Sequence, residues 1–130
     1  MIQDTSFIID VLRGDEGAQA LLDVIESESR PEKVASITVF ELYEGVARSG
    51  ASTSTQDRII NVLESKHIVP AGNEVMRKAG KLSGQLITEG QRIEREDCII
   101  AATGLLHDEA VVTGNADHFR RIDGLDVRTY

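Results

Sequence analysis

The 130-residue chain has few of the features that mark secreted or membrane proteins. Its single cysteine, Cys98, excludes a disulfide within the chain and favours a reducing compartment. No apolar run approaches the ~18 residues that span a bilayer. Asp4, Asp10 and Arg13 interrupt the first fifteen residues, which is not the pattern of a secretory signal peptide. We therefore predict a cytoplasmic protein without a membrane partner.

Aromatic residues and lysines are also scarce. The chain has no tryptophan, two tyrosines and three phenylalanines, so no platform for stacking RNA bases is recognisable. It has 22 acidic against 14 basic residues, a net charge of −8, which argues against a protein that simply coats nucleic acid. The excess acid is either a general solubility feature or is partly gathered to hold a cation, and composition does not choose between the two.

The hydrophobic pattern predicts one α/β domain over residues 1–130. Short apolar runs predict strands at residues 1–3, 34–37, 67–69, 110–112 and 125–127. Helical periodicity fills the intervening segments, including a helix that opens at Thr38 and a buried helix that starts at Cys98. Strands that alternate with helices are connected by right-handed crossovers. We expect a three-layer fold with a mainly parallel sheet of four or five strands flanked by helices.

Acidic and amide residues follow several of the predicted strands. Asp4 comes after the first strand, Glu41 after the second, and Asn115 and Asp117 after the fourth, while Asp97 begins the buried helix. Sites in parallel sheets form outside the carboxyl ends of the strands. If the first, second and fourth strands are neighbours, these side chains converge.

Each of these residues also has a purely local explanation. Asp4 could form an Asx turn, and Asp97 could cap the helix that follows it. Glu41 fits a capping box in which its side chain reaches back to the amide of Thr38. Asn115 and Asp117 could belong to an ordinary turn after Gly114. Caps can occur anywhere in a fold, so their gathering at one edge of one sheet favours a site.

The same residues lie in four segments whose order and spacing are familiar. They are Asp4-Thr5-Ser6, Glu41-Leu42-Tyr43-Glu44-Gly45, Asp97-Cys98-Ile99-Ile100-Ala101-Ala102-Thr103 and Thr113-Gly114-Asn115-Ala116-Asp117-His118-Phe119. Together they resemble the PIN-domain ribonucleases, and within that family the VapC-type toxins of toxin–antitoxin pairs. The resemblance implies a PIN-like fold and a metal-dependent endoribonuclease that hydrolyses RNA with a metal-activated water.

The resemblance also implies roles for individual residues. Asp4, Glu41 and Asp97 match the carboxylates that surround Mg²⁺ or Mn²⁺. Many relatives have an acid at the fourth position, which is Asn115 here, and Asp117 is an alternative fourth residue. The supporting hydrogen-bond positions are Thr5, Thr38 and Thr113. The partners implied are an RNA substrate, a VapB-like antitoxin and a second copy of the chain in a homodimer.

Other chemistries find less support in the residues. The three histidines have no zinc-ligand spacing. A phosphoacceptor receiver domain needs an aspartate after its central strand and a lysine after its last, and neither is present. A non-catalytic PIN module would not need the three acids. The alternative that stays open is a PIN nuclease of ribosomal or transfer RNA maturation without a toxin role. His118, Phe119, Arg120 and Arg121 follow the fourth segment and could contact substrate.

Overall fold

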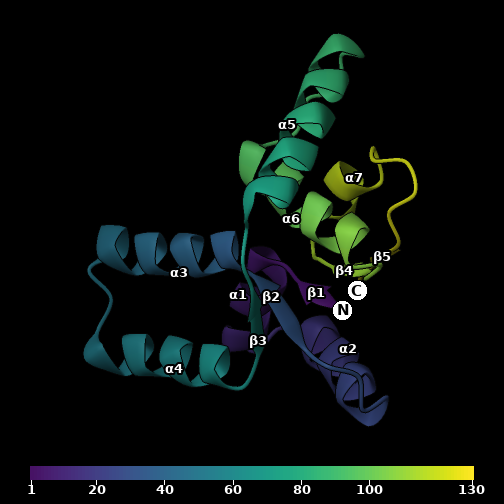
Figure 1. Ribbon diagram of the computed structural model, residues 1–130. Coiled ribbons are helices and arrows are strands. Elements are labelled where there is room, and N and C mark those ends of the chain that lie inside the picture. Colours follow the sequence, from purple (N-terminus) through teal and green to yellow (C-terminus); the bar gives the residue numbers. More distant parts are fainter.

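A five-stranded sheet lies at the centre of the structure, a computed structural model that describes all of residues 1–130 (Figure 1). The strands are β1 (Ile2–Gln3), β2 (Lys33–Ala35), β3 (His67–Val69), β4 (Val111–Val112) and β5 (Val127–Arg128). Their order across the sheet is β3-β2-β1-β4-β5, and every neighbouring pair is parallel. The α/β class and the parallel sheet are confirmed. β1 lies between β2 and β4, as convergence of the acids requires.

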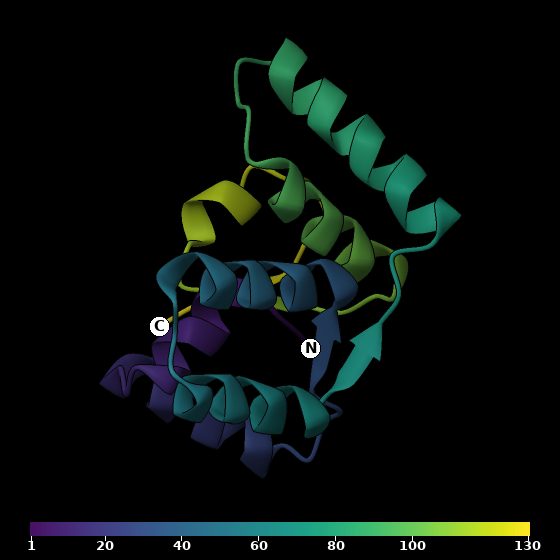
Figure 2. The same cartoon turned by 90° about the vertical axis from the view of Figure 1, so that its left-hand side faces the viewer.

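Seven helices connect and flank these strands. They are α1 (Thr5–Leu12), α2 (Glu16–Ser27), α3 (Ser36–Ser49), α4 (Thr53–Glu64), α5 (Asn73–Thr88), α6 (Arg95–Leu106) and α7 (Ala116–Phe119). In the two views of Figure 1 and Figure 2, α3 and α4 lie side by side as a pair, and α5 lies against α6. None of the helices is both long enough and apolar enough to pass through a lipid bilayer.

Helices cover both faces of the sheet, because successive side chains of a strand point to opposite faces. On one face, Ala35 and Val111 are fully buried in a cluster with residues of α5 and α6. On the other face, their neighbours Val34 and Val112 are buried against α1, α2, α3 and α4. The fold therefore has the three layers that were predicted. Cys98 is buried in the first cluster and serves packing.

Several element boundaries differ from the predicted ones. β2 ends at Ala35, and α3 begins at Ser36 rather than at Thr38. The apolar residue Ile37, which extended the predicted strand, is instead partly buried on the first turn of α3, where it packs against the core. A buried apolar residue at position 37 is compatible with the end of a strand and with the first turn of a helix, so the hydrophobic pattern alone did not locate the boundary between β2 and α3.

The later boundaries shift as well. α6 begins at Arg95, with Glu94 as its N-cap, rather than at Cys98. The final strand is Val127–Arg128, not residues 125–127, because Leu125 packs against the core as part of the connection. The four-residue helix α7 replaces the predicted turn after Gly114. All three differences lie in segments whose ends are fixed by tertiary contacts.

Candidate metal and active site

Asp4 directly follows the central strand β1 and is the most deeply buried acid of the candidate site, with 3% of its surface exposed. It is the N-cap of α1, and its Oδ1 accepts hydrogen bonds from the amide of Phe7 at 2.9 Å and from the hydroxyl of Ser6 at 2.8 Å. Its Oδ2 accepts a hydrogen bond of 2.6 Å from Oγ1 of Thr113, which follows β4. Asp4 is thus both a helix cap and part of the cluster at the sheet edge.

The environment of Asp4 favours its neutral form. The pKa of its carboxyl is raised from 3.8 to about 6: burial is the largest cause, the hydrogen bonds from Thr113, Phe7 and Ser6 lower the pKa, and the negative charge of Asp97 raises it. Burial therefore outweighs the donors. A carboxylate of this kind gains more than an exposed one from a nearby cation.

Glu41 reaches the same edge from α3. Its Oε1 accepts a hydrogen bond of 2.7 Å from Oγ1 of Thr5, the first residue of α1, and the hydroxyls of Thr5 and Thr38 lie 3.2 Å apart. The predicted capping box with the Thr38 amide is wrong, because α3 begins two residues before Thr38 and Glu41 lies beyond its first turn. Partial burial raises the pKa of Glu41, and the charges of Asp97, Glu96 and Asp4 add to this.

Asp97 reaches the cluster from the first turn of α6. It is not the N-cap of that helix, as the local alternative predicted, because Glu94 holds the cap position. Its Oδ2 lies 3.1 Å from Nδ1 of His118 on α7, and the two side chains are 18% and 32% exposed. Burial raises the pKa of Asp97 despite this histidine.

The two fourth-position candidates differ in their surroundings. The backbone amide of Asn115 donates to Oγ1 of Thr113 at 2.8 Å, and its side-chain Nδ2 lies 2.9 Å from Nδ1 of His118. Asn115 is therefore part of the polar network between Asp97 and Asp4, through His118 on one side and Thr113 on the other. Asp117 lies in α7, is exposed, and has no hydrogen bond or ion pair.

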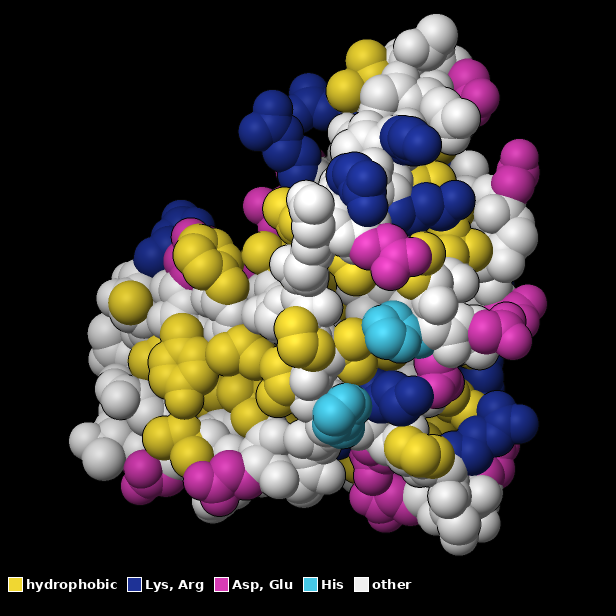
Figure 3. Space-filling model, in the orientation of Figure 1, with side chains coloured by type: hydrophobic (Ala, Val, Ile, Leu, Met, Phe, Trp, Pro, Cys, Tyr) yellow, Lys and Arg dark blue, Asp and Glu magenta, His cyan; other side chains and the backbone are white.

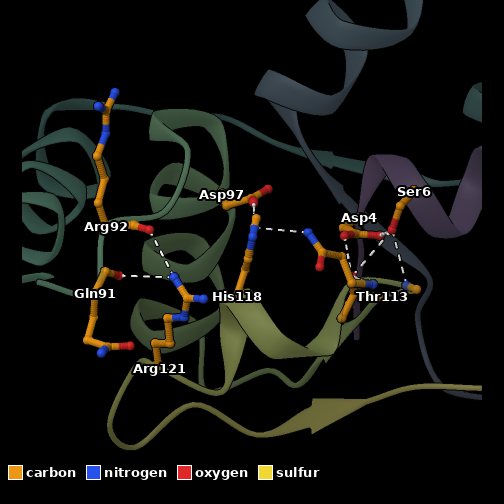
Figure 4. A network of polar contacts seen from close by, with 10 residues as sticks. Asp4, Ser6, Gln91, Arg92, Asp97, Thr113, His118 and Arg121 are labelled. Carbon is orange, nitrogen blue, oxygen red and sulfur yellow. Dashed lines mark hydrogen bonds and ion pairs between the residues drawn. The ribbon is translucent and has the colours of Figure 1, made fainter.

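Two residues connect the site in ways that the sequence analysis did not assign. The hydroxyl of Ser6 donates to Asp4, lies 3.3 Å from Oγ1 of Thr113 and accepts the amide of Gly114 at 3.1 Å. Nδ1 of His118 lies within hydrogen-bond distance of Asp97 (Figure 4) and of Asn115; it donates to the Asp97 carboxylate when it carries the proton and accepts from the Asn115 amide when it does not. Their only sequence signal is proximity to Asp4 and to Asn115, because the bonds of Ser6 to Thr113 and Gly114 and of His118 to Asp97 join distant parts of the chain.

The donor set determines which cation the site suits. Asp4, Glu41 and Asp97 interact electrostatically, since the charge of Asp97 raises the pKa of both other carboxyls. Carboxylate oxygens are ligands for hard cations such as Mg²⁺ and Mn²⁺. No three acidic, histidine or cysteine side chains are placed to ligate one ion together. The arrangement fits Mg²⁺, which takes one or two carboxylates and keeps several waters, and does not fit a cage made of protein ligands alone.

Comparisons with known proteins agree with this geometry. The sequence matches the PIN domain family over residues 1–125, so the chain belongs to the PIN domain family. The match includes all three acids and the segment after β4. The resemblance noted from four short segments therefore holds over nearly the whole chain.

Individual relatives are distant in sequence and close in structure. The chain is 27% identical to ribonuclease VapC19 of Mycobacterium tuberculosis over 118 residues, which is 89% of each protein. It is 25% identical to ribonuclease VapC1 of Methanocaldococcus jannaschii, over 100% of this chain and 86% of that one. Its fold is similar to VapBC2 from Rickettsia felis bound to promoter DNA, with a TM-score of 0.88, 21% identity and coverage of 99% and 97%. FitAcB from Neisseria gonorrhoeae matches with a TM-score of 0.80, 27% identity and coverage of 97% and 94%.

Proposed function

We propose that this PIN-domain protein is a Mg²⁺- or Mn²⁺-dependent endoribonuclease and the toxin of a VapBC-type toxin–antitoxin pair. The observation that supports the proposal is the interaction of Asp4, Glu41 and Asp97 at the carboxyl edge of the sheet: burial raises the pKa of all three, and the charge of Asp97 raises the pKa of Asp4 and of Glu41 further. The curated relatives are named ribonucleases VapC, and the similar structures are toxin–antitoxin complexes.

One or two of these carboxylates would hold the cation directly and the remaining acid would act through its waters; when bound, the ion would supply an activated water and neutralise charge on the scissile phosphate. The other residues of the site orient these carboxylates. Thr113 and Ser6 fix the two oxygens of Asp4, Thr5 fixes Glu41, and His118 fixes Asp97. Such outer partners set the orientation of ligating carboxylates, and their loss typically costs roughly 10–100-fold in metal affinity or activity.

A VapB-like antitoxin is the proposed protein partner. Figure 3 shows hydrophobic side chains gathered over α3 and α4, and two large apolar residues of α3, Phe40 and Tyr43, are 59% and 46% exposed. Exposed apolar patches of this kind mark protein interaction sites. Phe40 directly precedes Glu41 in α3, so a protein bound there would lie near the candidate site. We also propose a homodimer, which light scattering at micromolar concentrations would detect.

The substitution Asp97→Asn tests the nuclease function. It removes the charge and keeps the size of the side chain, so cleavage of a labelled RNA in Mg²⁺ or Mn²⁺ should fall by at least a hundredfold while the far-ultraviolet circular dichroism is unchanged. The matched control is Asp57→Asn on α4, an exposed aspartate without a hydrogen bond or ion pair, which should cleave like the parent. Equal cleavage by Asp97→Asn and the parent would refute the assignment of the site.

A further inference from the structure

Four of the fourteen lysines and arginines form ion pairs with carboxylates, and the unpaired ones include Arg13, Arg48 and Arg58 in the first half of the chain. Lys33 and Lys66, at the amino ends of β2 and β3, are paired with Glu109 at 2.5 Å and Glu32 at 2.9 Å. The other paired cations are Arg30 and Arg128, which both contact Glu28. By contrast, none of the seven lysines and arginines between residues 77 and 121 has a carboxylate partner; they are Arg77, Lys78, Lys81, Arg92, Arg95, Arg120 and Arg121.

A short series of contacts connects some of these free cations to the candidate site. Asp97 contacts His118, and the backbone carbonyl of His118 accepts a hydrogen bond of 3.3 Å from the amide of Arg121. The guanidinium of Arg121 in turn donates to the carbonyl of Arg92 at 3.0 Å (Figure 4). Arg121 is thus connected to Asp97 through His118 and holds the backbone of Arg92, whose exposed side chain has no partner.

The same surface continues onto α5. Lys78 and Arg121 line one hollow of about 260 Å³, together with Gln85 and Glu89. Lys81 lies three residues after Lys78 and therefore on the same side of the helix. Figure 3 shows Lys and Arg side chains gathered over α5. We call Lys78, Lys81, Arg92 and Arg121 the basic strip.

We propose that the basic strip binds the phosphates of single-stranded RNA beside the bond that is cut. An acidic protein with a net charge of −8 repels RNA as a whole, so a local group of unpaired cations is needed to hold the strand. The strip has no aromatic residue on which bases could stack, so it contacts the backbone and contributes no sequence preference. This inference deepens the proposed ribonuclease function, on which it rests.

Binding of a fluorescein-labelled uridine 12-mer, measured by anisotropy in EDTA, tests the strip without cleavage. Lys78→Gln, Lys81→Gln and Arg92→Gln should each weaken binding by about fivefold to tenfold at 50 mM salt and lower the salt slope by about 0.7, the value for one phosphate contact to a single strand. Arg48→Gln on α3 is the control, since Arg48 is exposed and unpaired but outside the strip. Glu89→Gln should tighten binding, because it removes a negative charge from the hollow that Lys78 and Arg121 line.

The outcomes separate this inference from the proposed function. If the three strip variants bind RNA as Arg48→Gln does, the basic strip is refuted, even where Asp97→Asn abolishes cleavage. If the strip variants lose binding but the parent does not cleave RNA in Mg²⁺ or Mn²⁺, the ribonuclease proposal is refuted and the strip stands. An unchanged salt slope together with weaker binding would show a structural effect instead of a lost phosphate contact and would also overturn the inference.

Discussion

Oγ1 of Thr113 donates a hydrogen bond of 2.6 Å to Oδ2 of Asp4, although 109 residues separate the two in the sequence. The bond is short because the acceptor is charged when Asp4 is ionised. It joins the carboxyl ends of the neighbouring strands β1 and β4. The position of the central acid therefore depends on a residue near the other end of the chain.

Thr113→Val removes this donor with almost no change in volume. It also removes the acceptor for the amide of Asn115, so we expect a loss of about 1–3 kcal/mol in unfolding free energy and a further rise in the pKa of Asp4. RNA cleavage at pH 7 should fall as well. The control is Thr103→Val, since Thr103 is equally buried but its hydroxyl bonds to Ile99 within the same helix. Equal cleavage by both variants would contradict the role of Thr113.

The raised pKa of Asp4 predicts how stability depends on pH. Because the folded carboxyl has a pKa of about 6 against an ordinary 3.8, the folded state binds the proton more tightly than the unfolded state. The unfolding free energy in EDTA should therefore fall as pH rises from about 4 to about 6. At about 1.4 kcal/mol per pKa unit, the contribution of Asp4 is about 3 kcal/mol.

Asp4→Asn removes this titration. The unfolding free energy of the variant, measured with urea, should therefore depend less on pH between about 4 and about 6. Glu41 and Asp97 also have raised pKa values and contribute a residual slope of the same sign. Glu32 and Glu109 act in the opposite direction, because their lowered pKa values add stability that is lost as pH falls below about 4.5. The difference in unfolding free energy between the parent and Asp4→Asn at each pH therefore reports the contribution of Asp4 alone. If that difference is the same at every pH, the prediction is contradicted.

Calorimetric titration with Mn²⁺ distinguishes the two fourth-position residues. Asn115 belongs to the network between Asp97 and Asp4, whereas Asp117 is exposed and without contacts. We therefore expect Asn115→Ala to weaken Mn²⁺ binding more than Asp117→Ala does. Asn115→Asp should tighten it by adding a full negative charge. The reverse order of the alanine variants would identify Asp117 as the fourth residue, and unchanged affinity in both would exclude the pair.

The sequence was sufficient to predict the sheet and the edge where the acids meet. A short apolar run followed at once by Asp4 or by Thr113 indicates both a strand and its carboxyl end, and the neighbours of β1 proved to be β2 and β4. The hydrogen bonds that hold the acids in place could not be predicted from the sequence. The bond between Thr5 and Glu41 depends on how α1 packs against α3, and that of His118 to Asp97 depends on how α7 packs against α6. Sequence patterns describe only residues that are close along the chain, so for Glu41 and Asp97 they suggested helix caps and not these long-range hydrogen bonds.

The bond between Asp4 and Thr113 has a consequence for synthesis on the ribosome. Asp4 is synthesised among the first residues, as are its donors Ser6 and Phe7, but the donor to its other oxygen, Thr113, follows 109 residues later together with β4. At roughly 5–20 residues per second, this delay is about 5–20 s. During that time the nascent chain has no assembled site, and a messenger RNA that encodes it is not exposed to cleavage by the unfinished protein. The fold thus delays the activity of each molecule until translation is nearly complete.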